Sequence, residues 1–240
     1  MSPNEELLAD ATALVASASE GGLILRLLGG IAVYASCPSS RLPPFARSCG
    51  DIDLVSPEPA GRITPLFEAL RWVPDAEFNL YNGDSRLCFH KGGKKADVFL
   101  GGFRMCHEIP LGGRYGEGPL TLPLAELLLT KLQVFEANSK DLDDASCLLL
   151  DHPVRLEDGE AINAAAIAHA CSADWGLWRT VSKNLGLLRG RLGEASAEAQ
   201  ERIAHIEETV SAEPKSLGWR MRSLVGDRMR WYELPEEVER

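Results

Sequence analysis

The pattern of apolar residues changes partway along this chain, and that change limits the folds it can adopt. Residues 23–28 and 51–55 are short apolar or alternating runs, which are typical of strands. After residue 151 the apolar positions recur instead at helical spacing, beginning with an alanine-rich stretch. We therefore predict an α+β fold, with a mixed sheet flanked by helices in residues 1–122 and an all-helical region in residues 123–240.

The same periodicities place the other elements. Gly92-Gly93 is a favoured two-residue hairpin loop, and it joins two of the predicted strands. The segment 37–50 is rich in proline and serine, and we expect it to be a loop. Further strands are predicted at 85–91, 94–100 and 103–109. Helices are predicted at 9–18, 31–36, 63–72, 123–137, 141–150, 161–171, 175–192, 195–210 and 219–225.

Charge and composition exclude several classes of protein. The net charge of −10 argues against a broadly basic surface that coats nucleic acid. No apolar stretch reaches the ~18 residues of a membrane span, and the acidic N-terminus lacks the basic region of a secretory signal. We therefore expect a cytoplasmic chain with no membrane partner. The six cysteines include no C-x-x-C pair, so we expect reduced thiols packed as small apolar side chains.

Two aspartates in the predicted strand 51–55 are the first candidates for chemistry. Because side chains alternate along a strand, Asp51 and Asp53 project to one side while Ile52 and Leu54 enter the core. Two charged carboxylates so close together repel unless a cation lies between them, and Mg²⁺ or Mn²⁺ prefers such oxygen ligands. A solvated strand face is the plainer interpretation of the same triplet.

Two further features could complete a site around these aspartates. Gly29 and Gly30 lie between a predicted strand and a predicted helix, where free backbone N–H groups can hold a triphosphate. Asp97 lies on the strand 94–100, on the face opposite its apolar neighbours. If this strand pairs beside Asp51 and Asp53, Asp97 becomes a third metal ligand and could accept the proton of an attacking hydroxyl.

These residues resemble a known family. The order L-x-G-G, then D-I-D-L at 51–54, then a strand ending A-D-V-F at 96–99 resembles the DNA polymerase β-like nucleotidyltransferase superfamily. The run LLTKL at 128–132 followed by KDLDD at 140–144 is similar to the abortive-infection type nucleotidyltransferases, which include toxins of type IV toxin–antitoxin systems. The resemblance implies a nucleotidyltransferase-fold sheet, a nucleoside triphosphate (NTP) such as ATP as substrate, and Mg²⁺ or Mn²⁺ as cofactor.

The second block adds two candidate nucleotide-binding residues. Lys131 lies on a helix that is otherwise apolar on one side, and the resemblance implies that it binds phosphate. Asp144 would help to orient the nucleotide site, together with Lys140 and Asp141. A capping and ion-pair cluster around Lys131 is an equally good structural interpretation.

The spacing departs from the family pattern. Residues 31–50 form a longer connection between the two glycines and the first aspartate than the superfamily usually has. Arg47, near the end of this connection, could reach a phosphate from a lid, and Ser48 could donate a hydrogen bond to it. The extra residues could equally be an inert insertion.

The reaction predicted is attack of an acceptor hydroxyl on the α-phosphorus of an NTP, with pyrophosphate leaving. Asp51, Asp53 and Asp97 are the catalytic and metal-binding residues of this prediction. The favoured acceptor is an RNA or tRNA end, followed by a protein or a small molecule, and a toxin-type enzyme implies an antitoxin partner. The rival interpretation is a degenerate, non-catalytic module of the same fold that binds a nucleotide or a protein.

The C-terminal tail carries basic residues interleaved with Trp219, Trp231 and Tyr232. They could bind an RNA backbone with aromatic stacking. The alternative, which we favour, is an amphipathic helix whose Trp219 and Leu224 pack on the α+β head while its basic residues pair with the acidic surface. The basic residues are Arg189, Arg191, Lys215, Arg220, Arg222, Arg228 and Arg230.

Overall fold

The structure, a computed structural model, describes residues 1–115, 120–193 and 196–234. The chain divides into two compact units. The first unit comprises Met1–Phe103 and Leu111–Pro123, and the second comprises Arg104–Pro110 and Leu124–Arg240. Each unit has its own core and is described separately below.

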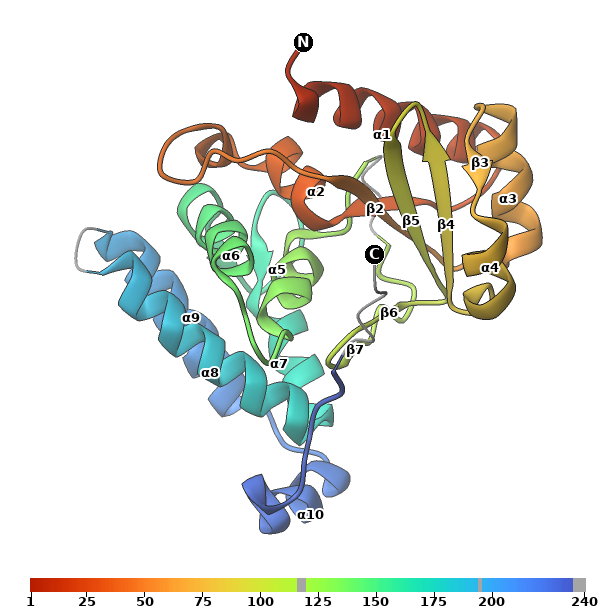
Figure 1. The fold of residues 1–240 in the computed structure, drawn as a ribbon. Helices are drawn as coiled ribbons and strands as arrows, with labels where there is room; N and C mark the ends of the chain where they lie inside the picture. Colours follow the sequence, from red (N-terminus) through yellow and green to blue (C-terminus); the bar gives the residue numbers. More distant parts are fainter. Residues whose placement is uncertain (116–119, 194–195, 235–240) are drawn as a thin grey trace. The chain divides into compact units, whose positions relative to one another are not determined.

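A five-stranded mixed sheet organises the first unit, within the part of the chain that the structure describes (Figure 1). The strand order is β1-β2-β5-β4-β3, with β2 and β5 parallel and the other neighbours antiparallel. This is the predicted α+β architecture. The strands are β1 (Arg26–Leu28), β2 (Asp51–Ser56), β3 (Val73–Pro74), β4 (Arg86–Lys91) and β5 (Lys94–Leu100).

The helices of the first unit begin and end at recognisable local signals. Ser2 forms a capping box with Glu5, so the first helix starts well before residue 9, where apolar periodicity alone placed it. Asp75 caps a short helix that the sequence reasoning missed, together with the strand before it. The helices are α1 (Pro3–Glu20), α2 (Gly29–Ser36), α3 (Ala60–Ala69) and α4 (Ala76–Asn82), and the loop after α2 contains one 3₁₀ turn, Pro38–Arg41.

The two faces of this sheet differ in chemistry. Ile52, Leu54, Ala96 and Val98 are fully buried, and they alternate along β2 and β5 with Asp51, Asp53 and Asp97. Phe67 of α3 stacks on Phe89 of β4, with ring centroids 4.1 Å apart. One face therefore forms the core of the unit, and the opposite face carries the three aspartates.

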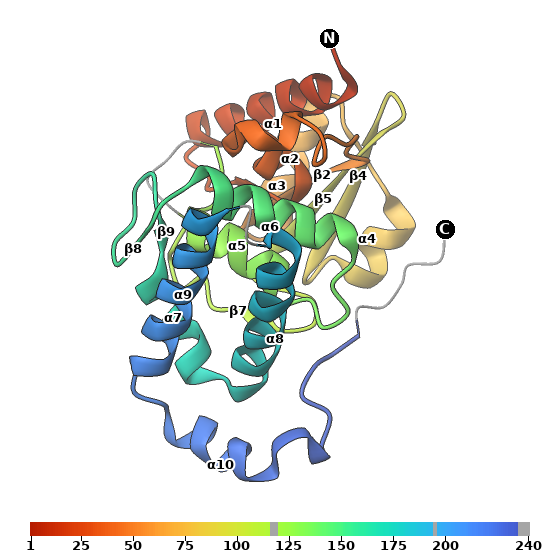
Figure 2. The ribbon, with the colours of Figure 1, turned by 90° about the vertical axis from the view of Figure 1, so that its left-hand side faces the viewer.

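The second unit is helical apart from short β pairs, as the sequence predicts for the C-terminal region (Figure 2). The predicted strand 103–109 is instead the pair β6 (Phe103–Arg104) and β7 (Glu108–Ile109), and β8 (Val154–Arg155) pairs with β9 (Ile162–Asn163). The helix predicted at 123–137 ends early, at Leu132, and Asn138 caps the start of the next helix. The helices are α5 (Leu124–Leu132), α6 (Ser139–Asp151), α7 (Ala164–Ala173), α8 (Trp175–Leu192), α9 (Ala197–Ala212) and α10 (Leu217–Val225).

Helix α8 has the predicted bounds, and α9 begins within two residues of its predicted start at residue 195, which itself lies outside the described residues. Among the helices that the structure describes, none combines the length and the apolar character needed to cross a membrane.

Candidate functional site

Strand register aligns the acidic residues across the polar face of the sheet. Asp53 of β2 pairs with Asp97 of β5, because the two strands are parallel and in register. Asp51, two residues earlier on β2, pairs with Lys95. Since directly paired residues project to the same side of a sheet, Asp51, Asp53 and Asp97 share one face.

These three carboxylates converge. Each offers one oxygen atom such that all three oxygens lie within 4.8 Å of one another. Asp97 is fully buried, whereas Asp51 and Asp53 are partly exposed. The structure thus brings together, from two separate stretches of chain, the three residues that the sequence predicts as one cluster.

Two cations contact one side of Asp97. Lys95 Nζ lies 2.8 Å from Asp97 Oδ2, and Arg86 Nη2 lies 3.1 Å from the same oxygen. Asp97 Oδ1 is buried and has no hydrogen-bond partner within the described chain. A buried carboxylate oxygen without a partner is costly, and a bound cation would satisfy it.

The donor set fits a hard divalent cation. Asp51, Asp53 and Asp97 supply carboxylate oxygens only, the ligands that Mg²⁺ and Mn²⁺ prefer. Because Asp51 and Asp53 are partly exposed, one side of the cluster is accessible to a phosphate oxygen.

Gly29 fits closely against this cluster. It is the first residue of α2 and has a φ of 71°, in the left-handed region. A Cβ at this position would lie 2.1 Å from Asp53 Oδ2. Only glycine therefore allows the N-terminus of α2, whose first N–H groups have no partner within the helix, to lie against the Asp53 carboxylate.

Arg47 lies over the other glycine. A Cβ on Gly30 would come within 2.8 Å of Arg47 Nη2 and 3.0 Å of Cys49 Sγ. Asn4 of α1 fixes this end of the loop, because its side chain donates to Arg47 O at 2.8 Å and accepts from Cys49 N at 2.8 Å. The long connection thus returns a guanidinium to the start of α2, where a phosphate could also bind. Ser48, between these residues, is exposed.

The remaining two predicted residues belong to the second unit. Lys131 Nζ lies 2.9 Å from Asp144 Oδ2 and 3.7 Å from Asp141 Oδ1, and Asp144 is buried. Asp141 also completes a capping box with Asn138 at the start of α6. The structure therefore contains the capping and ion-pair cluster, and nucleotide binding by Lys131 and Asp144 stays a prediction.

Two residues beside the acidic cluster, Arg86 and Lys95, contact Asp97 directly, and the sequence alone did not assign them this position. Arg86 is recognisable from the sequence only as a residue on the face of its strand, yet it pairs with Asp97 and lies 4.9 Å from the Phe99 ring centroid. Lys95 was not singled out. Its signal was its position two residues before Asp97, which places both side chains on one face.

The basic residues of the tail are largely engaged within the second unit. Arg189 pairs with Glu207 at 2.5 Å, and Arg191 pairs with Asp143 at 2.5 Å. Trp219 packs edge-on against Trp178, with ring centroids 5.2 Å apart. The prediction of paired basic residues is right for these two arginines. The predicted packing is wrong in two respects: the ring contact of Trp219 is with Trp178 of its own unit, and Leu224 is 83% exposed.

Comparisons with known proteins add little to this geometry. No protein-family model matches the sequence, and no curated protein matches it either. Among solved structures, the chain is similar to an antigenic nucleotidyltransferase-like protein from Paracoccidioides brasiliensis. The TM-score is 0.46 and the sequence identity is 14%, over 89% of this chain and 96% of that chain. So distant a similarity transfers no residue roles, and the functional assignment depends on the side chains described above.

Proposed function

We propose that this chain is a metal-dependent nucleotidyltransferase, which moves a nucleoside monophosphate from an NTP to an acceptor hydroxyl. The observation that supports it most is the convergence of Asp51, Asp53 and Asp97, whose carboxylate oxygens lie within 4.8 Å of one another. Gly29 lies beside them, at a position where a side chain would collide with Asp53. A strand face that merely meets solvent would not enclose Asp97 completely or leave its Oδ1 without a hydrogen-bond partner among the described residues.

The residues divide the work as follows. Asp51, Asp53 and Asp97 would hold Mg²⁺ or Mn²⁺, which when bound neutralises phosphate charge and polarises the reacting phosphorus. The N–H groups at the start of α2, from Gly29 and Gly30, would bind phosphate oxygens. Arg47 would pair with the triphosphate from above Gly30.

In the reaction, the acceptor oxygen forms a bond to the α-phosphorus while the bond from that phosphorus to the bridging oxygen breaks, releasing pyrophosphate. The hydroxyl proton must leave the acceptor, and Asp97, whose carboxylate would lie beside the bound cation, is the candidate base. Lys95 and Arg86 contact Asp97 Oδ2, so they would orient the carboxylate.

The acceptor is proposed to be an RNA or tRNA end, before a protein or a small molecule. This preference depends on the second sequence block, with Lys131 and Asp144, and on its similarity to toxin-type enzymes. The same similarity is the basis for proposing an antitoxin as a protein partner.

A second candidate function has its own supporting observation. Lys95 and Arg86 already supply positive charge to Asp97, as they would in a chain that no longer binds metal. Such a chain would be a non-catalytic module that binds a nucleotide without transferring it.

The test follows radioactive phosphate from the α-position of each NTP into RNA, protein and small molecules, with Mg²⁺ present. The wild-type chain should transfer the radioactive phosphate to one of these three classes of acceptor. Transfer by the double variant Asp51→Asn with Asp53→Asn should be at least about 100-fold slower, because two of the three metal ligands become neutral. Asp84→Asn, an exposed aspartate of the same unit, is the matched control and should retain turnover.

Two outcomes would contradict the proposal. Turnover that persists in the double aspartate variant would exclude these carboxylates from the chemistry. Saturable nucleotide binding without any labelled product would favour the binding module instead.

A further inference from the structure

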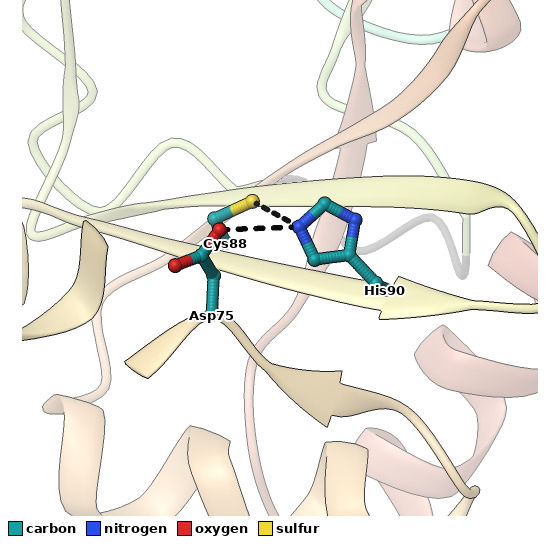
Figure 3. Close-up of side chains that lie close together, drawn as sticks. All are labelled: Asp75, Cys88 and His90. Atoms are coloured by element: carbon teal, nitrogen blue, oxygen red, sulfur yellow. Dashed lines mark hydrogen bonds and ion pairs between the residues drawn. The ribbon is translucent and has the colours of Figure 1, made fainter. Parts of the chain in front are cut away.

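A second group of potential ligands lies on the same sheet face as the carboxylate cluster. Asp75, Cys88 and His90 each offer one atom such that all three atoms lie within 4.8 Å of one another (Figure 3). Cys88 and His90 are two residues apart on β4, so both project to one side. Asp75 comes from the turn between β3 and α4, and its backbone N–H donates to Cys88 O at 2.9 Å.

We propose that Asp75, Cys88 and His90 form a second metal site, one that binds Zn²⁺ rather than the hard cation of the carboxylate cluster. A thiolate, an imidazole and one carboxylate are a borderline-soft donor set, which favours Zn²⁺ over Mg²⁺. The inference is independent of the proposed nucleotidyl transfer.

The separations of the donor atoms fit one tetrahedral ion. Cys88 Sγ lies 3.6 Å from His90 Nε2, and His90 Nε2 lies 3.3 Å from Asp75 Oδ2. With Zn–S near 2.3 Å and Zn–N and Zn–O near 2.05 Å, tetrahedral angles give separations of about 3.5 Å for S···N and about 3.3 Å for N···O. Little movement would therefore be needed to admit the ion.

The same geometry argues against a catalytic relay of thiol, imidazole and carboxylate. In such a relay the imidazole contacts the nucleophile through one nitrogen and the carboxylate through the other. Here Cys88 Sγ and Asp75 Oδ2 both contact His90 Nε2 (Figure 3). The three atoms surround a common point, as ligands do.

Neighbouring backbone contacts hold two of the ligands in place. Asp75 Oδ1 accepts from Phe78 N at 3.0 Å, which leaves Oδ2 directed at the histidine. The Asn79 side chain accepts from Cys88 N at 2.7 Å and donates to Cys88 O at 3.1 Å. Outer contacts of this kind orient metal ligands in known sites.

The proposed site would leave room for a fourth ligand. The side chains of His90 and Asp75 are 50% and 36% exposed, so water could reach an ion held between them. Three protein ligands with one open position are typical of zinc sites that bind a further small ligand. Cys88 pairs directly with Asp97 across β4 and β5, so the two metal sites would be neighbours on one sheet face.

The test uses Co²⁺ as a spectroscopic substitute for Zn²⁺, added to the metal-free, reduced full-length protein. We expect one equivalent of Co²⁺ to produce thiolate-to-cobalt charge-transfer absorption. Added Zn²⁺ should displace the Co²⁺ and remove this absorption. Cys88→Ala should abolish this absorption. His90→Ala should weaken binding by more than the ~10–100-fold that loss of a supporting outer contact costs. Circular dichroism would establish that each variant folds. If Cys88→Ala does not fold, the test depends on His90→Ala, whose side chain is half-exposed in the wild type.

Two controls separate this site from the rest of the molecule. Cys49→Ala removes a partly exposed thiol elsewhere in the same unit and should retain the absorption. Asp51→Asn with Asp53→Asn should also retain it, even where nucleotidyl transfer is lost. Absence of the charge-transfer absorption in the folded wild-type chain, or its survival in Cys88→Ala, would overturn the proposal.

Discussion

At the scale of single residues, the contact between Gly29 and Asp53 shows how little space the candidate site leaves. The strand register brings them together, since Leu28, just before Gly29, pairs with Asp53 across β1 and β2. The turn into α2 therefore passes directly over the carboxylate. A side chain at residue 29 would have to displace a proposed metal ligand.

We expect Gly29→Ala to lower both stability and activity. Alanine at a φ of 71° costs roughly 1–2 kcal/mol, and its Cβ would also push Asp53 Oδ2 away. Gly101→Ala is the matched control, because Gly101 has a φ of 75° but open space around it. Urea denaturation should show a larger loss of unfolding free energy for Gly29→Ala, and only this variant should lose nucleotidyl transfer. Equal effects of the two variants would mean that Asp53 moves aside freely.

At the scale of elements, Lys131 and Asp144 join α5 to α6. Their side chains are 13% and 7% exposed, so the pair is largely removed from water. Such a pair gains little over an apolar contact, but either member left alone is costly. The junction of the two helices therefore depends on both residues together.

This arrangement predicts a stability cycle for the two helices. Lys131→Met should lower the free energy of unfolding by about 3 kcal/mol, because it leaves the buried Asp144 carboxylate without its cation. The double variant Lys131→Met with Asp144→Leu should recover most of that loss. Chemical denaturation of the two variants and of wild type measures the difference. A double variant as unstable as the single one would show that the ion pair itself is needed.

At the scale of the whole molecule, five of the six cysteines are buried within the two units. Cys37, Cys88, Cys106, Cys147 and Cys171 are buried, and Cys49 is partly exposed. Burial raises the pKa of the Cys88 thiol to about 11 and that of Cys171 to about 12. Buried, protonated thiols are poor nucleophiles.

We therefore expect a chromogenic disulfide reagent to label one thiol rapidly in the native protein and all six after denaturation. Cys49→Ser should abolish the rapid phase, while the total after denaturation falls by one. Rapid labelling of several thiols in the native protein would contradict the packing of both cores. The expectation of reduced, buried cysteines holds for five of them, and the mutual approach of Cys88 and His90 was not foreseen.

Local rules were sufficient for much of the fold. Strand alternation placed Asp51 and Asp53 on one face, and apolar periodicity placed helix α8 at its observed bounds. Periodicity was less useful at helix ends, because capping by Ser2 and Asn138 starts α1 and α6 earlier than their apolar residues indicate. Short elements such as β3 and α4 leave too few residues for any period to be recognised.

The amino-acid order by itself determined which side chains each strand presents to one face, since that depends only on the two-residue repeat of an extended backbone. It also determined that Asp97 would be available as a third carboxylate. Only the tertiary structure decided that β5 lies beside β2 in a register that pairs Asp53 with Asp97. It likewise brought Arg47 to Gly30 and Asp75 to His90. These contacts join residues far apart in the chain, and their formation depends on the packing of whole elements.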